Sequence, residues 1–162
     1  MQTAQEVVPA GHWRTGDEAG QVVLVFDDRF RRRFRLKVEG FGGVLLDLPQ
    51  ARVLRDGDAL RLGDGQLVAI RAADEPLIEV RAASPTLLMR LAWHIGNRHL
   101  PARLEADRIL LRRDHVIAAM FTGLGAEVRE VDAPFDPEGG AYTEAPTGHH
   151  HHHASGEHHH HD

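Results

Sequence analysis

Histidine is the residue type with the greatest chemical potential in this sequence, because the chain has 13 histidines and no cysteine. Nine of them lie in the last 14 residues: His149, His150, His151, His152, His153, His158, His159, His160 and His161. Neutral imidazole is a good ligand for Ni²⁺, Cu²⁺ and Zn²⁺, whereas Ca²⁺ and Mg²⁺ prefer oxygen. This histidine-rich segment is therefore predicted to bind several transition-metal ions with little discrimination.

The histidine-rich segment has an irregular pattern, which bears on its origin. Five histidines are separated from four by Ala154-Ser155-Gly156-Glu157, and Asp162 follows them. A purification tag is the alternative explanation, but a designed tag is normally an uninterrupted run. We therefore interpret the segment as a native metal-binding element. Adjacent histidines cannot impose one coordination geometry, so the pattern favours metal storage and exchange over catalysis.

The other four histidines are His12, His94, His99 and His115. His99 lies in the turn-rich stretch Gly96-Asn97-Arg98-His99-Leu100-Pro101, and loops of this kind place side chains at a surface. His115 is expected to open a helix, where it could bind a metal or only be solvated. We expect His12 to be a surface side chain and His94 to be structural or partly buried. His99 and His115 are therefore the candidate ligands outside the histidine-rich segment.

The elements that must position these side chains change character near Glu75-Pro76. Before that point, turns rich in glycine and aspartate separate short stretches with apolar alternation or apolar runs, which predicts an all-β region. The strands expected there are residues 22–26, 30–38, 44–48 and 67–71.

Residues 29–37 form a basic stretch that resembles a nucleic-acid patch in composition. From Phe34 onward, however, apolar residues alternate with basic ones, which places the arginines and Lys37 on the solvated face of a strand. The formal net charge of −5 also argues against a general nucleic-acid binder. We therefore expect no nucleic-acid partner.

After Glu75-Pro76 the pattern alternates between strand and helix periods. A first helix should have Ser84 as its N-cap and end at Gly96, and a second should be capped by Asp114 and end at Gly125. The strands around them are expected at residues 77–81, 102–105, 108–111 and 127–131. The order β-α-β-β-α-β predicts a ferredoxin-like, four-stranded antiparallel sheet with both helices on one face.

The sequence therefore predicts an α+β protein in three parts. Residues 1–75 should form a small all-β domain, residues 76–134 a ferredoxin-like βαββαβ domain, and residues 135–162 a disordered histidine-rich tail. The tail is expected to be too poor in apolar residues to offset its ordering entropy. No apolar run approaches the ~20 residues that span a bilayer, and a secretory signal is not recognisable at the start, so we expect a cytoplasmic protein that contacts no membrane.

Three stretches carry a resemblance to a known family. They are Trp93-His94-Ile95-Gly96-Asn97-Arg98-His99-Leu100-Pro101, then Asp114-His115-Val116, then Phe135-Asp136-Pro137-Glu138-Gly139-Gly140-Ala141-Tyr142. Together with the histidine-rich end, they closely resemble the urease accessory metallochaperone family UreE. The resemblance is strongest in the C-terminal half. The β-rich residues 1–75 agree in kind with the family's peptide-binding-like domain.

The resemblance implies a cytosolic homodimer that stores Ni²⁺ and delivers it to the urease apoprotein with other urease accessory proteins, including a GTPase. It also implies that His99, the last residue of Gly96-Asn97-Arg98-His99, is the principal metal ligand. Family members often carry a His-Xaa-His pair at the start of the second helix, whereas this sequence has Arg113-Asp114-His115. Zn²⁺ or Cu²⁺ could bind the same nitrogen donors.

One ordered histidine cannot complete the coordination sphere of Ni²⁺, which takes about four to six donors. A two-fold axis through the loop would bring His99 from both subunits to one ion, and tail histidines could supply further donors. Two small domains have limited cores, so an apolar dimer interface would also add stability. We therefore expect residues 76–134 to serve both metal binding and dimerisation.

Two other functions compete with a nickel chaperone. A metal-dependent hydrolase needs fixed ligands and a positioned acid or base, and the sequence contains no His-Glu-Xaa-Xaa-His motif, nucleophile elbow or phosphate-binding glycine loop. A peptide-binding adaptor with an incidental metal-binding tail would use the β-rich half to hold a partner segment. The adaptor remains the main alternative, since a metal donor must also dock on its acceptor.

Overall fold

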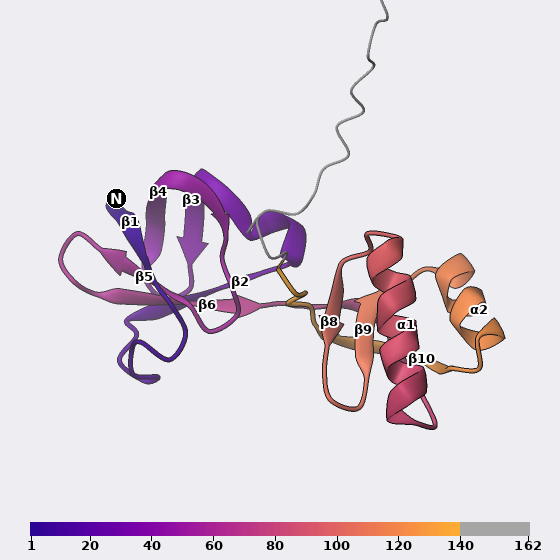
Figure 1. The fold of residues 1–162 in the computed structure, drawn as a ribbon. Helices are drawn as coiled ribbons and strands as arrows, with labels where there is room; N and C mark the ends of the chain where they lie inside the picture. Colours follow the sequence, from indigo (N-terminus) through magenta and orange to yellow (C-terminus); the bar gives the residue numbers. More distant parts are fainter. Residues whose placement is uncertain (140–162) are drawn as a thin grey trace, which may run out of the picture.

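The computed structural model describes residues 1–139 of the 162-residue chain. This part forms a six-stranded sheet followed by a four-stranded sheet. Figure 1 shows the two sheets as neighbouring units, with both helices α1 (Pro85–Asn97) and α2 (His115–Gly123) attached to the second. The predicted α+β class, with a β-rich N-terminal region and an α/β C-terminal region, is therefore confirmed. The candidate ligands from His149 onward lie outside the described residues.

The N-terminal sheet has the strand order β2-β6-β5-β1-β4-β3. A bridge joins Gln21 of β2 to Glu39, the residue directly after β3. Since β2 and β3 are the strands at opposite ends of this order, the sheet curls around its core. The β1–β4 and β2–β6 pairs are parallel, and the other pairs are antiparallel. The elements are β1 (Gln2–Val8), β2 (Gly20–Leu24), the 3₁₀ helix η1 (Phe26–Asp28), β3 (Phe30–Val38), β4 (Gly42–Val53), β5 (Ala59–Leu62) and β6 (Leu67–Ala72).

The apolar pattern predicts β2, β3, β4 and β6 but misses β1 and β5. In β1 the two buried residues, Ala4 and Val8, are separated by polar and half-buried ones, and β5 has only four residues. The predicted strand at residues 22–26 also ends early, because Phe26 belongs to η1. Short strands with few apolar residues carry little periodic signal, which explains these differences.

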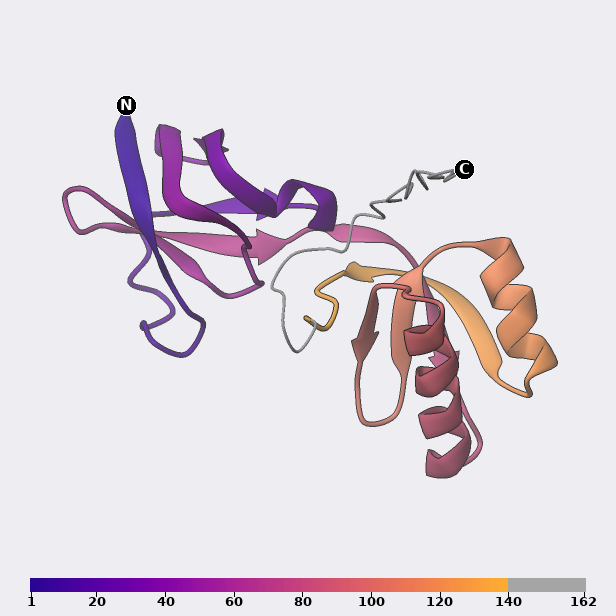
Figure 2. The ribbon, with the colours of Figure 1, turned by 45° about the horizontal axis from the view of Figure 1, so that its top comes forward.

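The C-terminal sheet has the order β10-β7-β9-β8, and all its pairs are antiparallel. Its strands are β7 (Asp74–Arg81), β8 (Ala102–Leu104), β9 (Ile109–Arg112) and β10 (Glu127–Pro134). Both helices lie on one face of this sheet (Figure 2). Their apolar residues pack against it in a cluster that includes Val80, Leu91 and Phe121. This arrangement confirms the predicted ferredoxin-like fold. The predicted boundary at Glu75-Pro76 falls inside β7.

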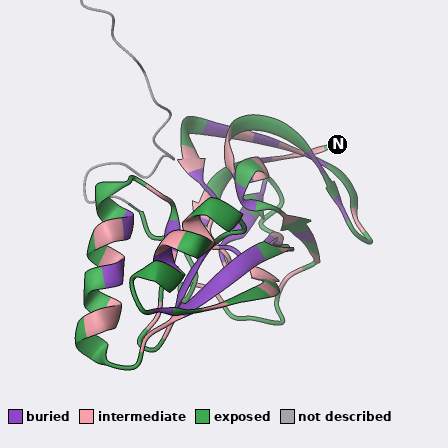
Figure 3. Ribbon diagram, turned by 90° about the vertical axis from the view of Figure 1, so that its right-hand side faces the viewer, coloured by how far each residue is buried: buried purple, intermediate pink, exposed green. Residues whose placement is uncertain are grey.

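Both helices begin with the predicted caps. The Ser84 hydroxyl accepts the N–H of Leu87, and the Asp114 carboxylate accepts the N–H groups of Val116 and Ile117. Each helix buries one side and leaves the other exposed (Figure 3). No helix among residues 1–139 is long and apolar enough to cross a membrane.

The junction between the two sheets corrects two predictions. Arg29, expected on a solvated strand face, precedes β3 and is fully buried, whereas Arg32, Arg33, Arg35 and Lys37 are exposed as predicted. Phe135, expected to start the disordered tail, is also fully buried, in a cluster with Phe26 and Leu77. Both side chains find partners that are more than 100 residues away in the sequence, so local patterning could not reveal their burial.

Candidate metal centre

His99 lies two residues beyond the end of α1, in the loop that leads to β8, as the sequence predicts. Two hydrogen bonds close the helix: the His99 N–H donates to the Gly96 carbonyl at 3.1 Å, and the Leu100 N–H donates to the Ile95 carbonyl at 3.3 Å. This pair of bonds defines a Schellman motif, in which the residue with left-handed backbone is most often glycine. Here that residue is His99, with a φ of 55°.

The left-handed backbone of His99 is a strained conformation for a residue with a side chain. Among residues 1–139, His99 is the only residue other than glycine with a positive φ. Left-handed backbone costs an L-residue roughly 1–2 kcal/mol, and such residues cluster at functional sites. Leu100 and Ile95 belong to the same apolar cluster, which holds the motif in place. The helix end therefore presents an exposed imidazole at a fixed position.

The C-terminal end of α1 favours a cation electrostatically. The last carbonyl groups of a helix carry a partial negative charge, and a nearby cation gains roughly 0.3–1 kcal/mol from it. His99 adds a nitrogen donor at this end. The combination suits a transition-metal ion better than an anionic ligand.

The outer face of α1 carries large exposed apolar side chains. Met89 is 72% exposed and Trp93 is 66% exposed, and the two lie one helical turn apart. The Trp93 ring packs edge-on against His94, with 5.2 Å between the ring centroids. His94 is half-buried, as expected, and His12 is exposed, as expected. The apolar stripe of Met89 and Trp93 lies on the helix that ends at His99.

His115 is the first residue of α2 and is exposed. It borders a groove of about 420 Å³ between α2 and β10, which is also lined by Arg113 and Glu130. The Arg113 guanidinium lies 3.8 Å from the Glu130 carboxylate and 3.6 Å from the Asp132 carboxylate. An ion-paired guanidinium thus occupies the place next to His115 where the resembled family often has a second histidine. This positive charge disfavours a strong metal site at His115.

The described part of the chain does not gather the candidate ligands into one site. Within residues 1–139, no three side chains of histidine, aspartate or glutamate come close enough to hold a metal ion together. His99 follows α1, and His115 begins α2. The candidate ligands at 149–153 and 158–161 lie beyond the described residues. Within residues 1–139 of one protomer, His99 can therefore offer an ion only a partial coordination sphere.

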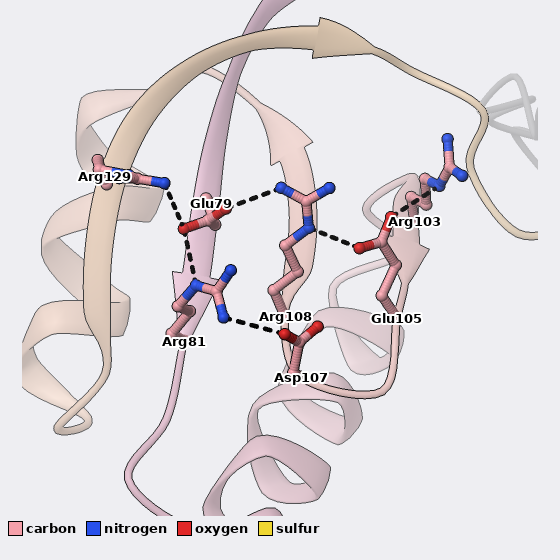
Figure 4. Close-up of polar contacts among 7 residues, drawn as sticks. All are labelled: Glu79, Arg81, Arg103, Glu105, Asp107, Arg108 and Arg129. Carbon is pink, nitrogen blue, oxygen red and sulfur yellow. Dashed lines mark hydrogen bonds and ion pairs between the residues drawn. The ribbon is translucent and has the colours of Figure 1, made fainter.

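The face of the C-terminal sheet opposite the helices carries a charged cluster that the sequence analysis did not single out (Figure 4). The Glu79 side chain is 3% exposed and accepts hydrogen bonds from Arg81 at 2.9 Å, Arg108 at 2.8 Å and Arg129 at 3.1 Å. These bonds, chiefly those from Arg81 and Arg108, lower the pKa of Glu79 from 4.5 to about 2. Because three guanidinium groups hold this carboxylate, it serves the fold rather than metal binding.

Comparison with known proteins decides the family. The model of the UreE urease accessory protein N-terminal domain matches residues 4–73, and that of the C-terminal domain matches residues 75–161. The chain belongs to the UreE family of urease accessory proteins. Membership in the UreE family confirms the resemblance carried by the histidine motifs and associates the chain with urease maturation.

Individual UreE proteins match most of the chain. A urease accessory protein UreE of Bradyrhizobium sp. (strain ORS 278) is 52% identical over 151 residues, which cover 92% of this chain and 70% of that protein. One from Rhodopseudomonas palustris (strain HaA2) is 52% identical over 148 residues, or 91% of this chain and 68% of that protein. One from Ruegeria pomeroyi is 45% identical over 150 residues, or 92% and 97% of the two chains.

Proposed function

We propose that this protein binds Ni²⁺ through His99, stores it and delivers it to the urease apoprotein during assembly of the urease active site. The observation that carries the proposal is the exposed imidazole of His99, just beyond the C-terminal end of α1, on a residue whose backbone is left-handed. Glycine would form the same turn with less strain. The presence of histidine there is therefore best explained by the chemistry of its side chain.

The proposal includes a homodimer, because one His99 supplies too few donors for Ni²⁺. A two-fold axis near the loop would bring two copies of His99 to one ion. The apolar stripe of Met89 and Trp93 supports an interface at this place, since its side chains are 72% and 66% exposed on the helix that ends at His99. Burying this stripe against its copy would remove large apolar surfaces from water.

The histidine-rich residues 149–161 supply the storage capacity in this proposal. Their imidazoles would bind further ions and exchange them with the His99 site. His115 is a peripheral ligand at most, because Arg113 lies beside it. Zn²⁺ and Cu²⁺ are expected to compete at the same nitrogen donors, since neither geometry nor donor type excludes them.

Delivery requires docking on other proteins, and we propose the urease apoprotein and the other urease accessory proteins, including the GTPase, as partners. In this proposal the protein is a carrier and not an enzyme. A carrier must release its ion, which suits a few exposed imidazoles. A catalytic metal site instead combines several fixed protein ligands with a positioned acid or base.

Equilibrium dialysis with Ni²⁺ tests the proposal on the full chain and on a chain that ends at Gly148. Removal of the tail should lower the capacity by several ions and leave about one ion per two chains. The retained ion should be lost when His99 is replaced by alanine. A shortened chain that binds no nickel would contradict the proposal. Activation of urease apoprotein by the nickel-loaded protein would then test delivery.

A second candidate function, a peptide-binding adaptor, is favoured by a groove of about 430 Å³ between β2 and β3. Apart from the Gln21–Glu39 bridge, the described residues form no pairing between these two edge strands, so backbone groups along the groove are free to pair with an added strand. Val23 and Phe34 are 52% and 38% exposed there, and Lys37 is one of the basic residues that line the groove. These features suit an extended acidic segment.

The same dialysis experiment separates the two functions. If the protein is only an adaptor with an incidental metal-binding tail, the chain ending at Gly148 should bind no Ni²⁺ and should still bind an acidic peptide. Replacement of Phe34 by serine should weaken the peptide complex, because it removes an exposed aromatic contact from the groove. If the protein is a nickel chaperone, the same replacement should leave the nickel stoichiometry unchanged.

A further inference from the structure

The last strand of the C-terminal sheet leaves one side of its backbone unpaired. β10 has eight residues and lies at one edge, in the order β10-β7-β9-β8. It pairs with β7 without a register shift, from Glu127 opposite Arg81 to Pro134 opposite Asp74. No strand among residues 1–139 pairs with its other side. A regular edge strand of this length offers a series of N–H and C=O groups to another chain.

The ladder bonds show which residues of β10 have these free backbone groups. The Arg113 N–H donates to the Pro76 carbonyl, so Pro76 directs its backbone groups to the side of β9. Its neighbour Leu77 therefore faces β10, where it lies opposite Val131. Because hydrogen-bonded and non-hydrogen-bonded positions alternate, every second residue of β10 directs its groups away from the sheet. These residues are Val128, Glu130 and Asp132.

A groove runs beside this edge strand, on the face of the sheet that carries the helices. It has a volume of about 420 Å³ and lies between α2 and β10, which are neighbours in Figures 1 and 2. Its apolar lining consists of Ile78, Ala118, Ala119 and Val128. The small side chains of the two alanines leave room for a side chain from another molecule. A strand added to β10 would direct every second side chain to this face.

The edge of β10 carries an excess of negative charge. The side chains of Glu130 and Asp132 are 72% and 73% exposed, and the single guanidinium of Arg113 lies 3.8 Å from one and 3.6 Å from the other. Glu127 is exposed and forms no ion pair within residues 1–139. Arg129, the one cation of β10, is held by the buried carboxylate described above. These charges favour a basic segment over an acidic one.

The same charges argue against a second copy of the chain as the added strand. If two copies of β10 paired antiparallel along their full length, each Glu130 would lie opposite the other. A shift of one strand by two residues would place Arg129 opposite Arg129, or Glu130 opposite Asp132, depending on its direction. Like charges directly opposite each other destabilise a strand pair. A partner of opposite charge therefore fits this edge better than a second copy does.

We propose that the free edge of β10 and the groove beside α2 form a docking site for an extended basic segment of a partner protein, which adds to the C-terminal sheet as a further strand. Backbone hydrogen bonds to Val128, Glu130 and Asp132 would supply affinity, and the groove would accept an apolar side chain. Lysine or arginine side chains would pair with the exposed carboxylates. This site is separate from the groove between β2 and β3, and its occupation does not depend on nickel.

The test measures binding of a short fluorescein-labelled peptide of alternating lysine and valine to the full chain, by fluorescence anisotropy. A peptide with glutamate in place of lysine is the charge control. Glu130→Pro removes one outward N–H and keeps the ladder with β7, since proline is tolerated on the open side of an edge strand. Glu130→Ala is its matched control, because it removes the same carboxylate and keeps the N–H.

A second pair of variants tests the groove without changing β10. Ala119→Trp places a large side chain in the groove. Its matched control is Val116→Trp, at a side chain that is 66% exposed on the same helix and does not line the groove. This pair keeps the proposal testable if Glu130→Pro does not fold. Hydrogen exchange of the backbone amides then shows where the peptide lies.

The wild-type protein should bind the basic peptide and not the acidic one. Glu130→Ala should weaken binding about two- to threefold, through one exposed ion pair, and Glu130→Pro about tenfold, because a hydrogen bond is also lost. Ala119→Trp should weaken binding to a similar extent as Glu130→Pro, and Val116→Trp should not weaken it. The peptide should slow the exchange of the amides of Val128, Glu130 and Asp132.

Three results would overturn the inference. The first is that the wild-type protein does not bind the basic peptide. The second is equal weakening by Glu130→Ala and Glu130→Pro, since it would show that charge alone attracts the peptide. The third is slower exchange in β2 and β3 rather than in β10, which would place the peptide on the N-terminal sheet.

Discussion

At the scale of single residues, His99 combines an exposed imidazole, the proposed metal ligand, with a backbone conformation that costs stability. Its backbone has a φ of 55°, in a helix end that glycine forms most readily. Its side chain is exposed and contributes little to the apolar core. Compared with glycine, the histidine therefore makes the turn slightly less stable, but it places an imidazole near the end of α1. Different substitutions should separate these two effects.

Replacing His99 by glycine and by alanine should have the same effect on metal binding and different effects on the turn. Both variants lose the imidazole, so both should lose the tight Ni²⁺ site in a chain that ends at Gly148. Glycine relieves the left-handed strain, whereas alanine keeps a Cβ there. The glycine variant should therefore be more stable than the alanine variant by roughly 0.5–1 kcal/mol. Calorimetric titration and urea denaturation measure the two effects. Undiminished nickel binding in either variant would remove His99 from the site.

Glu79 shows the reverse case, a charged residue that serves stability. Its pKa is lowered from 4.5 to about 2 in the folded protein, so its stabilising effect is complete above pH 4.5 and is lost as the pH falls towards 2. A shift of this size corresponds to about 3 kcal/mol. Glu79→Gln should therefore lower the free energy of unfolding by about 3 kcal/mol at pH 7 and by much less near pH 2. Glu130→Gln, at a side chain that is 72% exposed, is the matched control and should change it little.

At the scale of elements, the sequence predicts structure wherever the signal is local. Ser84 and Asp114 cap the two helices through contacts within three residues, and Gly125 ends the second with a φ of 92°. Burial that depends on distant partners escapes prediction. Arg29 and Phe135 meet across 106 residues, so the arginine looks solvated and the phenylalanine looks like the start of a tail. The left-handed backbone of His99 is likewise set by the way the helix end packs.

In the proposed function, helix α1 carries both the metal ligand at its end and the dimer interface on its exposed face. If its exposed stripe forms the dimer interface, Trp93→Asp should convert the dimer to a monomer and reduce the shortened chain's nickel affinity, because each ion then meets only one His99. Val116→Asp is the matched control, since Val116 is equally exposed at 66% but lies on α2. Light scattering after gel filtration measures the mass. If the Trp93→Asp variant stays dimeric and its nickel binding is unchanged, the dimer interface must lie elsewhere.

At the scale of the whole molecule, side chains from the N-terminal and C-terminal units meet at the junction between the two sheets. Arg29 from the N-terminal unit holds Phe135 and Asp136, which follow the last strand of the C-terminal unit. The β-rich unit thus helps to fix the positions of Phe135 and Asp136. It also has a groove of its own between β2 and β3. Cutting the molecule between β6 and β7 would separate Phe135 and Asp136 from the buried Arg29, even if both units folded.

The whole molecule should release nickel in acid before it unfolds. Only neutral imidazole can donate a lone pair to Ni²⁺, and histidine ordinarily titrates near pH 6.5, so protons compete for the same nitrogen. Because several imidazoles would bind each ion, retention should collapse steeply between roughly pH 7 and pH 5. The fold should persist through this interval, since the buried carboxylate of Glu79 has a pKa of about 2 and keeps its charge. Nickel retention after dialysis, with circular dichroism on the same samples, tests both parts. A protein that holds its nickel unchanged at pH 5 would point to carboxylate ligands, a class of side chain that ordinarily titrates near pH 4, and would refute histidine ligation.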